Sequence, residues 1–290
     1  MPLNYDLHCH STASDGTLEP EELVRHARSK GVDVLALTDH DTTAGVAQAS
    51  AAARACGVLL VPGVEISVTW NRRTVHIVGV NVDPADEPLQ RGLAGLRAFR
   101  RWRAQEIARR LDKAGIPGAE EGARRYAGGA IVGRTHFARF LVGAGHARQL
   151  RDVFKRFLVK DKPGYVPGQW ASLADAVAWI RGAGGMAVIA HPARYGLTAT
   201  KLRGLLGEFR DTGGEGLEVV TGSHSPQEIL AMAGYAKGFG LLASCGSDYH
   251  GPEDPWIEMG RLPALPETCT PVWAGDRWLH RDAGAWRVRA

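Results

Sequence analysis

The most informative stretch of the chain is Asp6-Leu7-His8-Cys9-His10-Ser11-Thr12-Ala13-Ser14-Asp15-Gly16, which places His8 and His10 two residues apart and Asp15 five residues after His10. Alternate residues of a strand point to the same face, so the imidazoles of His8 and His10 leave the strand end together and can reach one metal ion. Asp15 follows on the next loop. Divalent transition metals favour imidazole and carboxylate ligands, so this stretch predicts a metal site at the end of the first strand.

Similar polar residues accompany five further apolar runs of the chain. The additional ligand candidates in these runs are His40, Glu65, His76, His191, Asp248 and His250. About seven strands alternating with helices that stop at glycine predict an α/β barrel with a largely parallel sheet. The chemistry of such barrels sits at the C-terminal strand ends, where all candidates but one are expected. The exception, His76, stands early in its run, so either that strand runs against the others or its boundary is misplaced.

Nine candidate ligands are too many for one ion, because about four to six donors satisfy a single divalent cation. Two or three ions sharing a bridging carboxylate fit better, and Glu65 is the expected bridge. Two ions roughly 4 Å apart would lower the pKa of a water between them, and the resulting hydroxide would attack phosphorus in line. His224 follows another strand end and is expected to contact the substrate or to act as an acid.

The length and composition of the chain exclude some classes of protein. A chain of 290 residues can build a sizeable core, and it contains no apolar run of the roughly 18 residues that a membrane span needs. The N-terminus shows no signal-peptide pattern, and the four cysteines show no CxxC spacing. We therefore expect a cytoplasmic protein with reduced thiols and no membrane association.

A basic segment lies within an otherwise acidic chain. Residues 91–162 have a net charge of +12, whereas the rest of the chain has −8. Apolar residues at helical spacing from Leu96 to Leu111 predict a small helical insertion over residues 96–165, which separates barrel segments 1–95 and 166–290. Its position between the runs of His76 and His191 would place it over the barrel mouth. A basic lid suits a phosphate-bearing substrate, although a solvated arginine-rich face is the alternative.

Four motifs together resemble the PHP family (polymerase and histidinol phosphatase), a branch of the amidohydrolase superfamily. They are DLHCH at 6–10, TDHD at 38–41, AHP at 190–192 and SDYH at 247–250, and GVEI at 63–66 resembles the family's bridging glutamate. The resemblance covers most of the chain. It implies a distorted (β/α)7 barrel with a trinuclear site of manganese, iron or zinc, manganese being the first expectation. The implied ligand sets are His8, His10, Glu65 and Asp248; Glu65, His76 and His191; and Asp15, His40 and His250.

Within this family the chain most resembles the bacterial group that removes the 3′-phosphate from 3′,5′-nucleoside bisphosphates, such as adenosine 3′,5′-bisphosphate. The supporting segments are GRTHF at 133–137 and KDKPGYVP at 160–167. We accordingly predict Glu65, His224 and Asp248 as catalytic. The predicted substrate-binding residues are Arg134, Lys160, Arg194 and His224, because a cationic group in a turn or at a strand end can hold phosphate.

Three other functions stay open at this point. A 5′-3′ exoribonuclease on short RNA would use the same chemistry, with a basic track and exposed aromatic residues such as Trp102, Tyr126 and Phe137. A histidinol phosphate phosphatase is disfavoured, because its cationic substrate would need acidic groups in the lid. A catalytically inactive scaffold is disfavoured by the intact ligand set. The expected partner is a small anionic nucleotide or a short RNA, with no obligatory protein partner.

Overall fold

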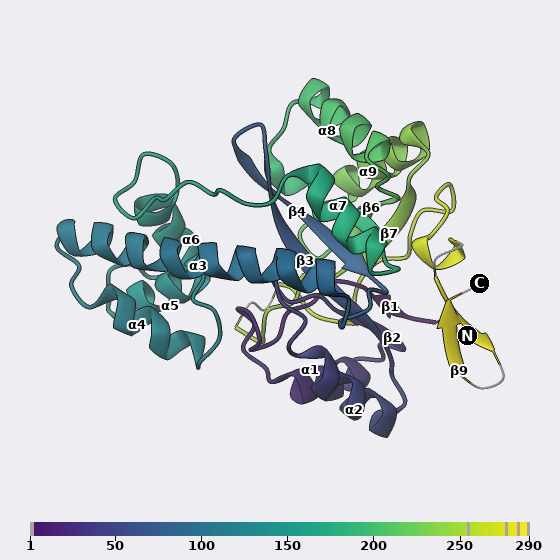
Figure 1. Cartoon of the computed structure of the whole chain (residues 1–290), viewed down its shortest axis with the longest axis horizontal. Coiled ribbons are helices and arrows are strands. Elements are labelled where there is room, and N and C mark those ends of the chain that lie inside the picture. Colours follow the sequence, from purple (N-terminus) through teal and green to yellow (C-terminus); the bar gives the residue numbers. More distant parts are fainter. Residues whose placement is uncertain (1–2, 254–255, 276–277, 283–284, 289–290) are drawn as a thin grey trace.

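The computed structural model describes residues 3–253, 256–275, 278–282 and 285–288 (Figure 1). Seven strands form one sheet in chain order: β1 (Tyr5–Asp6), β2 (Val34–Leu37), β3 (Leu59–Trp70), β4 (Arg73–Val80), β5 (Met186–Ile189), β6 (Gly216–Thr221) and β7 (Leu242–Gly246). The sheet curls back on itself, since the Leu7 N–H donates to the Cys245 carbonyl at 2.9 Å and Cys9 bridges in parallel to Tyr249. The predicted distorted seven-stranded barrel is confirmed.

One strand runs against the rest. β4 pairs antiparallel with both β3 and β5, whereas the other neighbouring strands are parallel. A tight turn at Asn71 and Arg72, both with positive φ, joins β3 to β4. The reversal explains the position of His76, because the beginning of an antiparallel strand lies at the same barrel end as the C-terminal ends of its neighbours.

The expected strand end at Glu65 is wrong. β3 continues to Trp70, and its hairpin pairing with β4 extends from Gly63 opposite Val80 to Trp70 opposite Arg73. Glu65 therefore lies inside a long strand that rises past the barrel rim. The backbone of Glu65 is held by pairing with β4 on one side and by an isolated bridge to His40 on the other.

The barrel has an interior and an outer apolar layer. Helices α1 (Pro20–Ser29), α2 (Val46–Cys56), α7 (Leu173–Gly182), α8 (Ala199–Asp211) and α9 (Pro226–Phe239) cover the outside. Alternate strand residues such as Ala36, Val78 and Val188 form the interior cluster, as the two-residue period of a strand requires. Trp278, only 3% exposed, joins this cluster. The C-terminal segment thus packs against the N-terminal end of the barrel, and it also contains η3 (Val272–Ala274) and the hairpin β8 (Leu279–Asp282) and β9 (Ala285–Val288).

The basic segment folds into helices that project to one side of the barrel in Figure 1. They are α3 (Glu87–Lys113), α4 (Ala119–Ala127), α5 (Arg134–Gly143) and α6 (Leu150–Val153), followed by the short π-helix η1 (Phe154–Leu158). The first half of α3 packs on the barrel through Leu89 and Leu93, and its second half joins a separate apolar cluster through Ile107 and Leu111. The predicted boundary at residue 96 falls inside α3 and stays a prediction. Within the described ranges, no helix is long and apolar enough to cross a membrane.

Candidate metal centre

The nine predicted ligands gather at one end of the barrel around the buried carboxylate of Glu65. Glu65 Oε2 lies 2.7 Å from His40 Nδ1. Glu65 Oε1 lies 2.8 Å from His76 Nδ1 and 3.0 Å from His191 Nε2. The Glu65 side chain is 1% exposed, so its two oxygens face imidazoles and no solvent. This is the arrangement expected of a bridging carboxylate.

A first group of donors surrounds the histidines of the opening motif. The Nε2 atoms of His8 and His10 lie 3.1 Å apart. Asp248 Oδ1 lies 3.5 Å from the first of these nitrogens and 3.3 Å from the second. Glu65 offers Oε1 at 3.5 Å and Oε2 at 3.4 Å to the same two nitrogens. Donor atoms of four residues thus converge from β3 and from the segments that follow β1 and β7.

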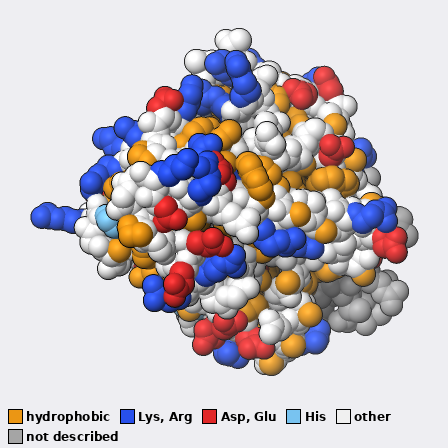
Figure 2. All heavy atoms as spheres, turned by 60° about the vertical axis from the view of Figure 1, so that its left-hand side comes forward, with side chains coloured by type: hydrophobic (Ala, Val, Ile, Leu, Met, Phe, Trp, Pro, Cys, Tyr) orange, Lys and Arg blue, Asp and Glu red, His pale blue; other side chains and the backbone are white. Residues whose placement is uncertain are grey.

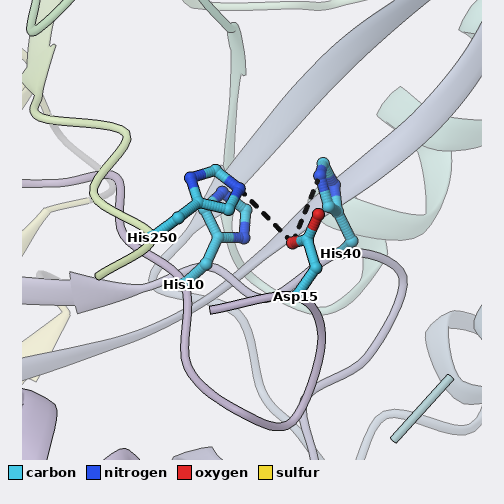
Figure 3. A group of neighbouring side chains, drawn as sticks. All are labelled: His10, Asp15, His40 and His250. Carbon is cyan, nitrogen blue, oxygen red and sulfur yellow. Dashed lines mark ion pairs between the residues drawn. The ribbon is translucent and has the colours of Figure 1, made fainter. Parts of the chain in front are cut away.

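A second group lies on the solvent side of the first (Figure 3). Asp15 Oδ1 lies 3.3 Å from His250 Nε2 and 3.9 Å from His40 Nε2, and His10 completes the group. Donor atoms of all four residues lie within 4.8 Å of one another. His40 also belongs to a group with Glu65 and His76. His10 and His40 therefore each lie where they can serve two ions, and the division into three ligand sets remains a prediction.

The ligands differ in protonation state. Burial by itself would raise the pKa of the Glu65 carboxyl, but the surrounding imidazoles, first that of His40, hold it well below its usual value. Burial lowers the pKa of His10 to about 3 and that of His76 to about 4. At His8, His40 and His250 the carboxylates of Glu218, Glu65 and Asp15, respectively, outweigh burial and raise the pKa of the imidazole. A metal binds the neutral imidazole and the ionised carboxylate, so Glu65, His10 and His76 already favour the binding form, whereas these three histidines release a proton when a cation binds.

Buried polar atoms without hydrogen bonds also indicate metal binding. Asp15 Oδ1, His40 Nδ1 and Glu65 Oε2 are buried, and within the described residues none of the three makes a hydrogen bond of good geometry. A buried polar atom without a hydrogen bond is costly unless another partner satisfies it. Divalent cations satisfy nitrogen and oxygen donors of this kind, so the residues present fit bound metal.

The backbone is strained at two ligands. His191 has φ +28° and Asp248 has φ +59°, and both are non-glycine residues in the sparsely populated left-handed half of φ/ψ space. His191 also precedes Pro192, a position that normally favours extended backbone. Such conformations persist only where neighbouring groups hold them. The His191 N–H donates to Glu218 Oε2 at 2.5 Å, and the Asp248 N–H donates to the His8 carbonyl at 2.8 Å.

Glu218 is a site residue that the sequence reasoning missed. It lies in β6, is 1% exposed, and holds two ligands through its two oxygens. Oε1 lies 2.7 Å from His8 Nδ1, and Oε2 accepts from the His191 N–H. Because a carboxylate accepts hydrogen bonds, His8 Nδ1 is the donor and His8 Nε2 keeps its lone pair for a metal. A glutamate inside the apolar run Gly216-Leu217-Glu218-Val219-Val220 was the available signal.

Further carboxylates fix the ligand-bearing loops. Asp39 accepts from the Ser11 N–H at 2.8 Å, from Ser11 Oγ at 2.7 Å and from Ser14 Oγ at 2.5 Å, which shapes the loop that carries Asp15. Asp41 accepts from Arg100 Nε at 2.6 Å. Arg100 lies in α3, so this bond ties the basic insertion to the loop that carries His40.

The predicted substrate residues lie at different places. Arg194 donates to Asp248 Oδ2 at the edge of the ligand cluster, with half of its side chain exposed. Arg134 lies over the Phe154 ring at 5.6 Å. Burial, followed by the charge of Arg100, lowers the pKa of the Arg134 guanidinium, whereas the charge of Asp15 acts to raise it. Lys160 is exposed, and no contact described here joins it to the cluster.

His224, His136 and Phe137, which the sequence analysis considered for substrate or RNA contacts, are buried outside the cluster. His224 is 9% exposed, and its Nδ1 lies 3.1 Å from the Val219 carbonyl oxygen; no described contact joins it to the ligands. His136 Nδ1 accepts from the Gly133 N–H at 2.9 Å, which caps α5. Phe137 is fully buried in the core of the insertion, so of the three aromatic residues considered for RNA only Trp102 and Tyr126 are exposed.

A barrel of seven strands whose rim gathers six imidazoles and three carboxylates defines a metal-dependent hydrolase of the amidohydrolase type. A family model described as PHP domain matches residues 6–165. The 3′,5′-nucleoside bisphosphate phosphatase of Chromobacterium violaceum is 48% identical over 93% of this chain and 95% of its own. The chain belongs to the PHP domain family.

Two further comparisons agree with this membership. The 5′-3′ exoribonuclease Rnm of Escherichia coli is also 48% identical, over 93% of this chain and 92% of its own. A solved structure of an amidohydrolase from Chromobacterium violaceum, with bound sulfate and no metal, superposes with a TM-score of 0.91 and 47% identity, covering 93% of this chain and 95% of that one. The chain therefore shares both its fold and nearly its whole length with these relatives.

Proposed function

We propose that this protein is a phosphoric monoester hydrolase that removes the 3′-phosphate from 3′,5′-nucleoside bisphosphates, such as adenosine 3′,5′-bisphosphate, and leaves the 5′-nucleotide. The observation that carries the proposal is the buried ligand cluster around Glu65, complete at all nine positions, at the foot of a basic insertion. The relative of that name, 48% identical over 93% of the chain, supports the choice of substrate.

The proposed cofactors are two or three divalent cations, manganese being preferred to iron or zinc. Glu65 would bridge, with His8, His10 and Asp248 on one side, His76 and His191 on another, and Asp15, His40 and His250 toward solvent. When bound, such cations acidify water and neutralise the charge that develops on a phosphoryl group. The protein's own contribution is to hold these ligands in place, through the contacts of Glu218 with His8 and His191 and the strand pairing around Glu65.

The substrate contacts are proposed from charge and position. Arg194 has an exposed guanidinium at the cluster edge, so it can exchange its bond with Asp248 for a bidentate contact to phosphate. Arg134 and Lys160 are proposed to hold the second phosphate from the insertion. His224, with a buried Nε2 that lacks a hydrogen bond among the described residues, is the candidate that protonates the leaving 3′-oxygen.

Phosphate release in the presence of manganese tests the proposal. The substrates are adenosine 3′,5′-bisphosphate, 3′-AMP, 5′-AMP and histidinol phosphate. We expect release of one phosphate from the bisphosphate with 5′-AMP as the product. Preferred hydrolysis of histidinol phosphate, or of 5′-AMP, would contradict the proposed substrate class.

A second function, 5′-3′ hydrolysis of short RNA, is supported by the exoribonuclease name of a relative at the same 48% identity. Both activities break the same kind of bond, between phosphorus and a 3′-oxygen. In the bisphosphate the phosphate carries no further group, whereas in RNA it carries the next nucleotide. The two functions therefore differ in whether the protein has room for a group attached to the reacting phosphate.

A further inference from the structure

The cationic groups proposed to bind substrate come from two parts of the chain. Figure 2 views the molecule from the side of the insertion, and Lys and Arg side chains are spread over that face. Arg194 instead comes from the barrel, on the short 3₁₀ helix η2 (Pro192–Tyr195), which directly follows the ligand His191. The Arg194 side chain is half exposed, so the place of its guanidinium depends on what fixes this short helix. Tyr195, the last residue of η2, makes contacts that do so.

The Tyr195 hydroxyl lies between two strands of the barrel. It accepts from the His76 N–H at 2.8 Å and donates to the Ala190 carbonyl oxygen at 2.8 Å. The His76 carbonyl oxygen lies 3.3 Å from the same hydroxyl. A phenol keeps its proton near neutral pH and can accept and donate at once. One side chain thus satisfies a backbone donor of β4 and a backbone acceptor of the residue that follows β5.

These two backbone groups would bond to each other in a regular ladder. β4 and β5 are antiparallel with Ile77 opposite Ile189, so the next opposed residues are His76 and Ala190. Two residues of a hydrogen-bonded antiparallel pair exchange two hydrogen bonds. The first is present, because the Ala190 N–H donates to the His76 carbonyl oxygen at 3.1 Å. The Tyr195 hydroxyl takes the place of the second and holds the ladder open at this point.

The opened pair stands beside two of the metal ligands. His76 Nδ1 and His191 Nε2 lie 2.8 Å and 3.0 Å from Glu65 Oε1. The Tyr195 ring packs edge-on against the His191 ring, with centroids 5.4 Å apart and planes at 68°. Arg73 Nη1 donates to the Tyr195 carbonyl oxygen at 3.2 Å, which ties η2 to the β3–β4 hairpin. Tyr195 therefore contacts the backbone of one ligand and the ring of the other.

We propose that Tyr195 is a positioning residue of the metal centre, whose hydroxyl sets the spacing of His76 and His191 and whose place in η2 sets that of Arg194. The inference rests on the proposed metal cofactors and not on the identity of the substrate. In a regular ladder the direct bond from His76 to Ala190 would draw together the strand ends that carry the two imidazoles. Phenylalanine at position 195 keeps the ring but removes the shared partner of both backbone groups, so these groups either shift or stay unpaired.

Manganese binding tests the role independently of catalysis. Manganese is titrated into metal-free wild type, Tyr195→Phe and Tyr235→Phe in competition with a chelating dye. We expect Tyr195→Phe to weaken one class of manganese site about tenfold and the remaining sites by less, since tenfold is the lower end of the range for groups that orient metal ligands. Tyr235→Phe is the matched control and should bind manganese as wild type does. The Tyr235 ring packs on the outer apolar layer under Arg203, and no contact in the described part of the chain joins it to the ligands.

Kinetics and thermal unfolding separate positioning from a purely structural role. In Tyr195→Phe, the manganese concentration for half-maximal phosphate release from adenosine 3′,5′-bisphosphate should rise about tenfold, and saturating manganese should restore kcat. KM for the bisphosphate should rise by less than in Arg194→Ala, because the guanidinium is retained but held less firmly. An unchanged KM would overturn the part of the proposal that concerns Arg194.

The outcomes distinguish this inference from the proposed function. Manganese binding by Tyr195→Phe that equals that of wild type would overturn the positioning role. A lower melting temperature with unchanged manganese affinity would overturn it as well, because the hydroxyl would then stabilise the fold alone. Weaker manganese binding by Tyr195→Phe, together with a wild type that releases no phosphate from the bisphosphate, would support the inference and overturn the proposed function.

Discussion

Glu218→Gln is the perturbation that most directly tests how the metal centre is held. The carboxylate accepts from His8 Nδ1 at 2.7 Å with one oxygen and from the His191 N–H at 2.5 Å with the other. Glutamine has the same shape but one acceptor oxygen, so its NH₂ group must face one of these two donors. Either His8 loses the bond that orients its ring, or His191 loses the bond that supports its φ of +28°.

The expected magnitude follows from the lost bond. A buried hydrogen bond to a charged acceptor contributes about 1.5–3 kcal/mol, and the opposed NH₂ group adds to that loss. If the lost hydrogen bond leaves His8 or His191 poorly oriented, manganese affinity should fall about 10–100-fold. This is the range typical of groups that orient metal ligands. Glu218 acts through His8 and His191, so it is a positioning residue.

The assay is manganese affinity, measured by competition with a chelating dye, together with thermal unfolding of the metal-free protein. Glu208→Gln is the matched control: Glu208 accepts from Trp70 Nε1 at 2.7 Å away from the ligands, and glutamine can still accept there. Its manganese affinity should equal that of wild type. A Glu218→Gln protein that binds manganese within about twofold of wild type would refute the positioning role. A loss of thermal stability with unchanged affinity would assign Glu218 a purely structural role.

Three further predictions follow from the site and the insertion. Glu65→Gln should abolish turnover with little loss of folding stability, because it removes the bridge; near-normal kcat with an unchanged Tm would argue against a shared-metal site. Arg194→Ala should raise KM for a bisphosphate far more than for a simple aryl phosphate, and equal effects would exclude a role with the second phosphate. Burial lowers the pKa of His136 to about 4. Between pH 6.5 and 4 the unfolded chain therefore binds more protons, and acid should cost up to about 3 kcal/mol of stability. His136→Gln should flatten that dependence in thermal unfolding, and an unchanged pH profile would contradict it.

The ligand types and their places at strand ends were predictable because they depend on local patterns. The two-residue period brings His8 and His10 to one face, and parallel strands bring their C-terminal ends to one rim. The early position of His76 signalled a reversed strand, although spacing alone left a misplaced boundary open. The location of Glu65 was mispredicted, since only the pairing of β3 with β4 carries the strand on to Trp70.

Local sequence patterns therefore predicted the barrel, its ligand-bearing rim and the basic character of the insertion. The residues that surround these features follow only from tertiary packing. Glu218 is 210 residues from His8 in sequence, and no local period links a single glutamate in an apolar strand to a ring that far away. A cleft of about 930 Å³ beside the metal centre joins segments near residues 12, 42, 97 and 126 in the same way. Periodicity predicts which face of a strand or helix a residue occupies. Which residue it contacts on that face depends on how the closed barrel and the insertion pack together.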